Sequence, residues 1–221
     1  MQPVVPPPPG IIPNTRIQKL LLNDSLGAIR VGIFIYVNGN PIRIHFLETA
    51  TGNPYFEFNY DKYGRLAESI SIYNNGSYEA WRRYFYDTSS RIVLEFAYIF
   101  GNMSESPNPV GNLTHYTEFQ YDAQNRISQY AVHAGGPPAV TTCTYNAQGN
   151  LDITGASYDS ETNYRRTNAI WIFLDRDYSM NNRLGATSYN AQGLPLGFQA
   201  VTPPQNVKFL SKELVGSVIT Y

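Results

Sequence analysis

The fold is decided by a pattern that residues 119–130, FQYDAQNRISQY, show clearly. An aromatic-ended segment leads into a short polar stretch, and a run with alternate apolar residues follows. Residues 143–154, CTYNAQGNLDIT, repeat nearly the same pattern. Asp or Asn after the tyrosine can accept a hydrogen bond from the backbone two residues later, and Gly or Asn at the fifth place tolerates a positive φ. Each copy therefore predicts a strand, a tight turn and a second, antiparallel strand.

Seven copies of this unit occur along the chain. The most complete copy is YDKYGRL at residues 60–66. The copies begin at Tyr36, Tyr60, Tyr86, Tyr121, Tyr145, Tyr178 and Tyr189, and those at Tyr36, Tyr178 and Tyr189 are the weakest. A spacing of 24 residues, as between Tyr36 and Tyr60, accommodates two strands of about eight residues and two turns.

The segments between the copies alternate with the period of two that is typical of strands. Residues 29–35, 65–73 and 91–100 each place apolar side chains on one face, and Asn-Gly pairs at 38–39 and 75–76 predict hairpin turns. No segment shows a sustained helical period, and a helix is suggested only at 205–214. We therefore predict an all-β protein with one large antiparallel meander of about 13–15 strands, forming a strongly curved sheet or half-open barrel.

The N-terminal segment MQPVVPPPPGIIPN differs in composition from the rest of the chain. Its prolines favour an extended, solvated polyproline II conformation. We therefore predict a flexible tether at residues 1–14 and a single β-domain at residues 15–221. The total of 221 residues suits one such domain.

Composition and charge exclude several classes of protein. Charged residues make up 15% of the chain, against roughly 25% in an average globular protein, and the formal net charge is −1. A nucleic-acid partner is not expected, because such proteins normally carry a basic stripe. No apolar run approaches the roughly 20 residues of a membrane-spanning helix. Cys143 is the only cysteine and cannot form an internal disulfide. No signal peptide is visible, and a natural precursor could still carry one together with a lipid anchor.

The Tyr-Asp-x-x-Gly-Arg-Leu unit resembles the YD repeat of the RHS family. The irregular spacing behind a Pro-rich tether resembles secreted or lipid-anchored Bacteroidetes proteins of unknown function with a porin-like β-domain. The resemblance covers roughly residues 16–200 and rests on seven short motifs, of which only the copy at Tyr60 matches every defined place. It implies an antiparallel meander outside the bacterial cytoplasm, either periplasmic, anchored to the outer membrane or secreted. It offers no catalytic residues.

Four residues are candidates for ligand binding, namely Trp81, Arg83, Tyr84 and Trp171. Aromatic rings with a neighbouring arginine could stack on sugar rings or anchor a protein partner, and they could equally pack between strands. Two acidic clusters at 159–161 and 175–177 could supply paired carboxylates. The three histidines are far apart in sequence, so we predict no metal site and no cofactor.

These features favour a non-catalytic binding or structural module of the bacterial cell envelope, with a glycan or another envelope component as partner. The first alternative is a carrier of lipid or another apolar ligand in the concave face of the sheet. The second alternative is a hydrolase that uses paired carboxylates. The sequence leaves the oligomeric state open.

Overall fold

A computed structural model describes residues 10–12, 14–23, 29–46, 54–104, 113–183, 186–198 and 218–221. The chain divides into two compact units. The first includes Phe34–Thr142, and the second includes Pro7–Ile33 together with Cys143–Tyr221. Residues 1–9 of the predicted tether lie outside the described residues. Its later part belongs to the second unit, where the Ile12 N–H donates to the Arg166 carbonyl at 2.9 Å.

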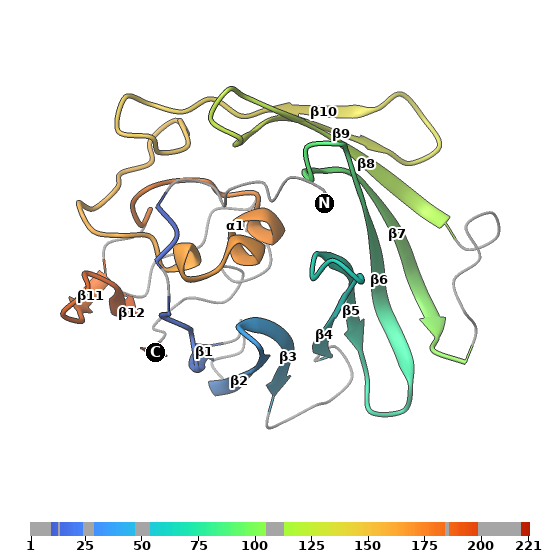
Figure 1. Cartoon of the computed structure of the whole chain (residues 1–221), viewed down its shortest axis with the longest axis horizontal. Helices are drawn as coiled ribbons and strands as arrows, with labels where there is room; N and C mark the ends of the chain where they lie inside the picture. The colour runs from blue at the N-terminus through green and yellow to red at the C-terminus, as the bar shows by residue number, and fades with distance from the viewer. Residues whose placement is uncertain are drawn as a thin grey trace. The chain divides into compact units, whose positions relative to one another are not determined.

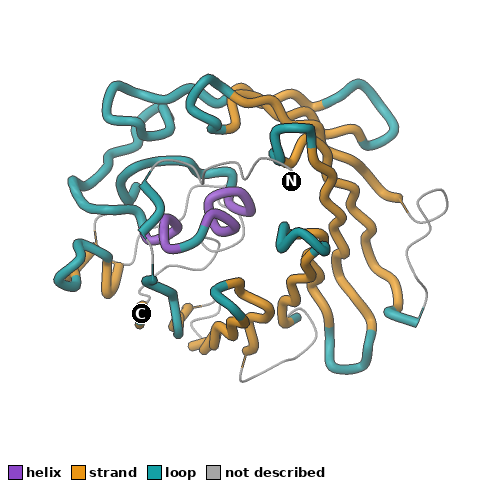
Figure 2. The backbone as a smooth tube through the Cα atoms, viewed as in Figure 1, coloured by secondary structure: helices purple, strands orange, loops and turns teal. Residues whose placement is uncertain are grey.

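Strands make up most of the regular secondary structure of the described chain, as Figure 2 shows. Thirteen strands form one antiparallel sheet in the order β10-β9-β8-β7-β6-β5-β4-β3-β2-β1-β13-β12-β11. Their bounds are β1 Lys19–Asn23, β2 Ile29–Val37, β3 Asn40–Phe46, β4 Tyr55–Tyr60, β5 Leu66–Ile72, β6 Ser77–Tyr86, β7 Ile92–Asn102, β8 Leu113–Tyr121, β9 Ile127–His133, β10 Ala139–Thr142, β11 Ala186–Tyr189, β12 Pro195–Phe198 and β13 Val218–Thr220. The predicted all-β meander is confirmed, and among the described residues the sheet is open, because the pairing order ends at β10 and at β11. Figure 1 labels both edge strands.

The repeated motif forms the turn that the sequence predicts. In the copy at Tyr86, the Asp87 Oδ1 atom accepts the N–H groups of Ser89 and Arg91 at 2.9 Å each. The Arg91 Nε donates to Asp87 Oδ2 at 2.9 Å, so one carboxylate fixes both the backbone and the guanidinium. The copies at Tyr60 and Tyr121 have the same three bonds. We call this arrangement the aspartate clamp.

The fifth residue of each clear copy has a left-handed backbone. These residues are Gly64, Ser90, Asn125, Gly149 and Gly193, with φ between 57° and 81°. The last two belong to copies in which asparagine replaces the aspartate. Asn146 and Asn190 still accept the two backbone N–H groups, so the turn forms without the guanidinium.

The motif tyrosine links each turn to the preceding strand pair. The Tyr86 hydroxyl donates to the Leu66 carbonyl at 2.7 Å, and the Tyr121 hydroxyl donates to the Ile92 carbonyl at 2.7 Å. The Arg65 guanidinium lies 4.2 Å from the Tyr86 ring centroid, which is within cation–π range. Successive turns are therefore connected along one end of the sheet. Burial, opposed by the nearby Arg65 charge, raises the pKa of Tyr86 well above its usual range, so its hydroxyl remains a donor.

The second unit contains helices that the sequence analysis missed. A short 3₁₀ helix, η1 (Tyr164–Thr167), precedes α1 (Ala169–Asp175). Asn168 caps α1 by accepting the Ile170 N–H at 3.0 Å, and the helix ends at Arg176, which has φ 51°. The weak copy at Tyr178 follows this helix and does not join two strands, so that prediction is wrong. The helix suggested at 205–214 lies outside the described residues.

Each unit has its own buried residues. A cluster in the first unit comprises Ile70, Ile72, Tyr78, Trp81 and Tyr98. The second unit buries Ile17, Leu20, Tyr164, Trp171, Ile172, Leu194, Phe198 and Ile219. Six of these side chains are aromatic, so aromatic rings contribute to the core of both units.

Candidate functional site

The structure separates the four predicted ligand-binding residues. Trp81 is 7% exposed and belongs to the buried cluster of the first unit, whereas Trp171 is 0% exposed and lies in the second unit. Tyr84 is also buried, and its hydroxyl lies 2.6 Å from Ser69 Oγ. Trp81 and Arg83 share one face of β6, and Tyr84 points to the other face. The three rings therefore pack inside the protein, and a ligand could stack on them only after the surrounding side chains had moved.

Arg83 is the predicted residue that the structure places at a candidate surface. Strand pairing aligns one residue from each of six neighbouring strands. These residues are Asn59, Glu68, Arg83, Phe96, Tyr116 and His133, in order from β4 to β9. We call them the cross-strand row. Asn59 is exposed and the other five are half-buried, so the row lies at the surface of the first unit.

One half of the row is polar. Asn59 Nδ2 donates to Glu68 Oε2 at 3.1 Å, and Arg83 Nε donates to Glu68 Oε1 at 2.9 Å. Glu68 therefore orients both neighbours. The Arg83 guanidinium carbon also lies 5.6 Å from the centroid of the Trp81 ring, which holds the side chain against the sheet.

The other half of the row is aromatic. The rings of Phe96 and Tyr116 meet edge to face at 6.1 Å, and the rings of Tyr116 and His133 stack at 4.3 Å with an interplanar angle of 6°. Phe85, which is 44% exposed, lies 5.0 Å from Phe96 and widens this surface. Glu118 Oε2 lies 2.9 Å from His133 Nε2. Flat rings thus adjoin side chains that can donate and accept hydrogen bonds.

The sequence contained part of the signal for this surface. Alternation in residues 91–100 correctly places Phe96 and Tyr98 on one face of a strand. The register between strands decides which residue of the next strand lies beside Phe96. Irregularities of the β-bulge type shift this register between β6 and β7 and again between β7 and β8. Phe85, Phe96, Tyr116 and His133 were therefore missed.

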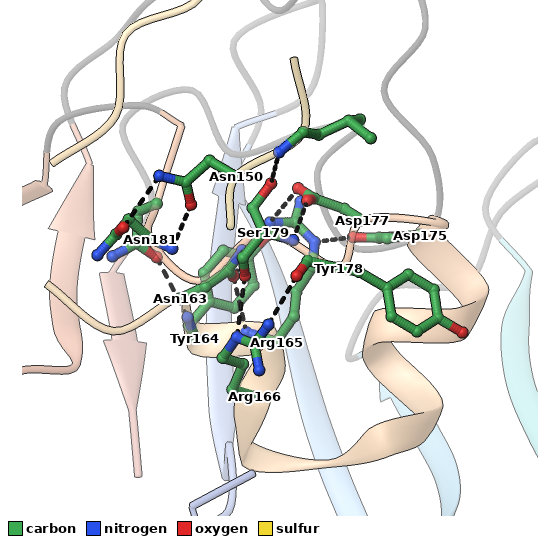
Figure 3. A network of polar contacts seen from close by, with 12 residues as sticks. Asn150, Asn163, Tyr164, Arg165, Arg166, Asp175, Asp177, Tyr178, Ser179 and Asn181 are labelled. Carbon is green, nitrogen blue, oxygen red and sulfur yellow. Dashed lines mark hydrogen bonds and ion pairs between the residues drawn. The ribbon is translucent and has the colours of Figure 1, made fainter. Parts of the chain in front are cut away.

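The second unit contains a buried polar network around two consecutive arginines (Figure 3). Arg165 Nε donates to Asp175 Oδ2 at 2.5 Å, and Arg165 Nη1 lies 3.5 Å from Asp177 Oδ2. Burial alone would lower the pKa of Arg165, but Tyr164, Asp175 and Asp177 raise it above its usual range. The guanidinium therefore stays charged, and both carboxylates of the 175–177 cluster have a cationic partner.

Arg166 and three asparagines hold together segments that have little regular structure. Arg166 donates from Nε to the Ser179 carbonyl at 2.9 Å and from Nη2 to the Tyr178 carbonyl at 2.6 Å. Asn150 and Asn181 exchange two hydrogen bonds across 31 residues of sequence, as Figure 3 shows. Asn163 Nδ2 donates to the Ser179 carbonyl at 3.3 Å. These side chains satisfy backbone groups that strands satisfy elsewhere.

The acidic cluster at 159–161 has partners as well. Asp159 accepts hydrogen bonds from the Asn182 backbone at 3.1 Å and from the Tyr189 hydroxyl at 2.8 Å. Burial, aided by the hydrogen bond to Asp159, raises the pKa of Tyr189 to about 12. Asn181 Nδ2 donates to the Glu161 carbonyl at 2.9 Å. Asp159 thus connects the segment before the Thr162–Asn181 bridge to Asn182 and to the end of β11.

A hollow of about 320 Å³ lies beside two neighbouring turns of the first unit. Asp61, Arg65 and Asp87 line it. Each of these charged groups already takes part in an aspartate clamp. In the described part of the chain, no three His, Cys, Asp or Glu side chains gather as a metal site would require. Within the same ranges, no helix is long and apolar enough to cross a membrane.

Comparisons with known proteins give little further information. No protein-family model matches the sequence, and no curated protein matches it. A chain from the Tc holotoxin pore of Photorhabdus luminescens is 12% identical, with a TM-score of 0.28 over 84% of this chain and 11% of that chain. A chain in the crystal structure of TcdB2-TccC3-TEV is 12% identical, with a TM-score of 0.25 over 86% of this chain and 10% of that chain. This chain thus spans about a tenth of either protein, and TM-scores this low indicate neither a shared fold nor a shared function.

Proposed function

We propose that this protein is a non-catalytic binding module that recognises a glycan through the cross-strand row. The observation that supports this function is the half-exposed run of Phe96, Tyr116 and His133 beside the hydrogen-bonded Glu68 and Arg83. A sugar ring presents apolar C–H groups on its faces and hydroxyl groups around its edge. Aromatic rings with neighbouring donors and acceptors match both properties.

The charges along the row favour an uncharged saccharide. Glu68 is paired with Arg83, so the polar half of the row has no net charge. An anionic or cationic chain would gain little from these paired groups. We therefore infer a neutral glycan as the ligand.

We further propose that the chain is an RHS-like, YD-repeat protein that works outside the cytoplasm, at the bacterial cell envelope. The repeated aspartate clamps support this assignment, because the tyrosine, aspartate and arginine that define the repeat have matching structural roles at three turns. The single cysteine and the low content of charged residues accord with this location.

The two alternative functions receive less support. A lipid carrier needs a continuous apolar face, whereas the face of the sheet opposite the row buries Ser69, Ser71, Glu95 and Thr117. A hydrolase needs carboxylates that are free to act on a substrate. The carboxylates of Asp159, Asp175 and Asp177 instead have hydrogen-bonding or cationic partners within the chain.

A glycan array followed by calorimetric titration of the best saccharide tests the proposal. Tyr116→Ala and Arg83→Gln should each weaken binding at least tenfold, because they remove a ring and a donor from the row. Phe100→Ser is the matched control, since Phe100 is 75% exposed and lies on β7 outside the row. Failure of the intact protein to bind any neutral glycan, or equal losses in all three variants, would contradict the assignment.

A further inference from the structure

The edge strand β10 differs from the other edge of the sheet. It pairs with β9 over four consecutive residues without a register shift, and no second neighbour pairs with it in the ranges that the structure describes. All four of its residues are exposed, and Val140 is 55% exposed. One row of its backbone N–H and C=O groups therefore has no strand partner among the described residues.

Natural proteins usually protect such an edge with charged residues, proline or β-bulges. The edge strand β11 follows this rule, because its pairing with β12 has two register shifts. β10 has no charge and no proline within it, and its register with β9 is regular. The sequence from 134 to 151 contains no Asp, Glu, Lys or Arg at all. Four residues make β10 a short strand, and Pro137 and Pro138 directly precede it, but within β10 no charge, proline or β-bulge opposes pairing with another strand.

We propose that β10 pairs antiparallel with the β10 strand of a second copy of this chain. A two-fold axis perpendicular to the sheet relates the two strands, and the residue at this axis lies opposite its own equivalent. Either Val140 faces Val140 or Thr141 faces Thr141. Neither arrangement opposes like charges. Valine and threonine also favour extended structure. The chain as a whole carries a net charge of −1, so two copies repel each other weakly.

The association is expected to be weak and reversible. Two strands of four residues bury much less than the roughly 1,200 Å² of a typical stable interface. The dimer should therefore form only at high protein concentration, and the fraction of dimer should rise with concentration.

Sedimentation equilibrium in reducing buffer measures this association without cross-linking through Cys143. Between about 1 μM and about 500 μM the average mass should rise from 24.9 kDa towards twice that value. Val140→Lys and Val140→Glu should each keep the protein monomeric, because each places like charges opposite or diagonal to one another in both registers. An equal mixture of the two variants should dimerise again.

Gln148→Lys is the control, because it adds the same charge at an exposed turn in the same uncharged segment. Circular dichroism and urea unfolding of every variant verify that the fold is kept. The proposal is overturned if the intact chain stays monomeric over the whole range, or if Val140→Lys dimerises as well as the intact chain. It is also overturned if Gln148→Lys abolishes association to the same extent, or if the mixture of Lys and Glu variants remains monomeric.

Discussion

Removal of the Asp87 carboxylate tests the physical basis of the repeated turn. Asp87 Oδ1 accepts two backbone N–H groups, and Oδ2 accepts the Arg91 Nε at 2.9 Å with Nη2 at 2.8 Å. Asp87→Asn keeps an oxygen for the two N–H groups and removes the ion pair. Asp87→Ala removes all of these bonds. The two variants therefore separate the contribution of the turn from that of the charge.

The expected magnitudes differ by severalfold. A partly exposed ion pair contributes about 0.2–1 kcal/mol, which is the expected cost of Asp87→Asn. Each hydrogen bond to the backbone contributes about 0.5–1.5 kcal/mol, so Asp87→Ala should lower the free energy of unfolding by about 2 kcal/mol. Asn146 supports the smaller value, because an asparagine already accepts both N–H groups in the equivalent turn.

Urea unfolding monitored by tryptophan fluorescence measures both values. Trp81 and Trp171 are the two tryptophans, one in each unit, so a shared Trp171→Phe background makes the signal report the first unit. If Asp87→Asn destabilises the protein as much as Asp87→Ala, the ion pair and not the accepting oxygen holds the turn. The reasoning on the repeat would then be refuted.

The same variants predict a pH dependence. Partial burial would raise the pKa of Asp87, but hydrogen bonds from Arg91 and Ser89 and the Arg91 charge outweigh it and lower the pKa below its usual value. A lowered pKa means that the carboxylate contributes stability above about pH 4, its unfolded value, and that this contribution is lost as the pH falls through the folded value. The difference in stability between the intact protein and Asp87→Asn should therefore shrink between pH 7 and pH 3. A difference that stays constant over this range would contradict the assigned role of the charge.

Four further substitutions test other parts of the structure by urea unfolding. Ser90→Gly should stabilise the first unit by about 0.5–1 kcal/mol, because Ser90 has φ 57°. Gly64→Ala should destabilise it by about 1 kcal/mol through the positive φ alone, because a Cβ at this position meets no atom within 4 Å. A change of the same sign in both variants would contradict this explanation. Gly101→Ala should cost about 1–3 kcal/mol because a Cβ there would overlap a buried tyrosine ring, and a neutral result would show that the ring moves aside. Asp175→Ala should destabilise the second unit by about 3–5 kcal/mol, because it leaves the buried Arg165 charge without its main partner. Replacing both Asp175 and Arg165 by apolar residues should destabilise the unit less. A larger loss of stability in the double variant would refute this account.

The sequence predicted the fold where local chemistry controls it. Tyr-Asp or Tyr-Asn followed by a residue that accepts positive φ specifies its own turn, so the copies at Tyr60, Tyr86, Tyr121, Tyr145 and Tyr189 were placed correctly. The copy at Tyr178 failed because serine, and neither aspartate nor asparagine, follows the tyrosine. Helix α1 was missed because seven residues are too few to establish a helical period, and its stability comes from the Asn168 cap and burial of Trp171.

The candidate site was predicted less well because it depends on register between strands. Arg83 was identified because it adjoins Trp81 in the sequence, yet the side chains that lie beside it in space come from β5 and β7. The sequence alone does not distinguish a tryptophan that stacks on a ligand from one that packs in the core. Trp81 and Trp171 both proved to be buried. Exposed phenylalanine and half-exposed histidine, which composition alone does not single out, form the aromatic surface instead.

The two units satisfy their backbone polar groups in different ways, and this difference governs how each should respond to change. In the first unit, strands pair with neighbours and the three aspartate-clamp turns are each held by a side chain at most four residues away, so the effect of a substitution stays local. In the second unit, Arg165, Arg166 and Asn150 connect segments that lie 10 to 31 residues apart in the sequence. Each of these bonds depends on the others to keep the same loops in place, so substitutions there should interact strongly. Repeated local turns can therefore vary in sequence from copy to copy, as aspartate and asparagine do here, whereas the network around the two arginines has no second copy to replace it in the described chain.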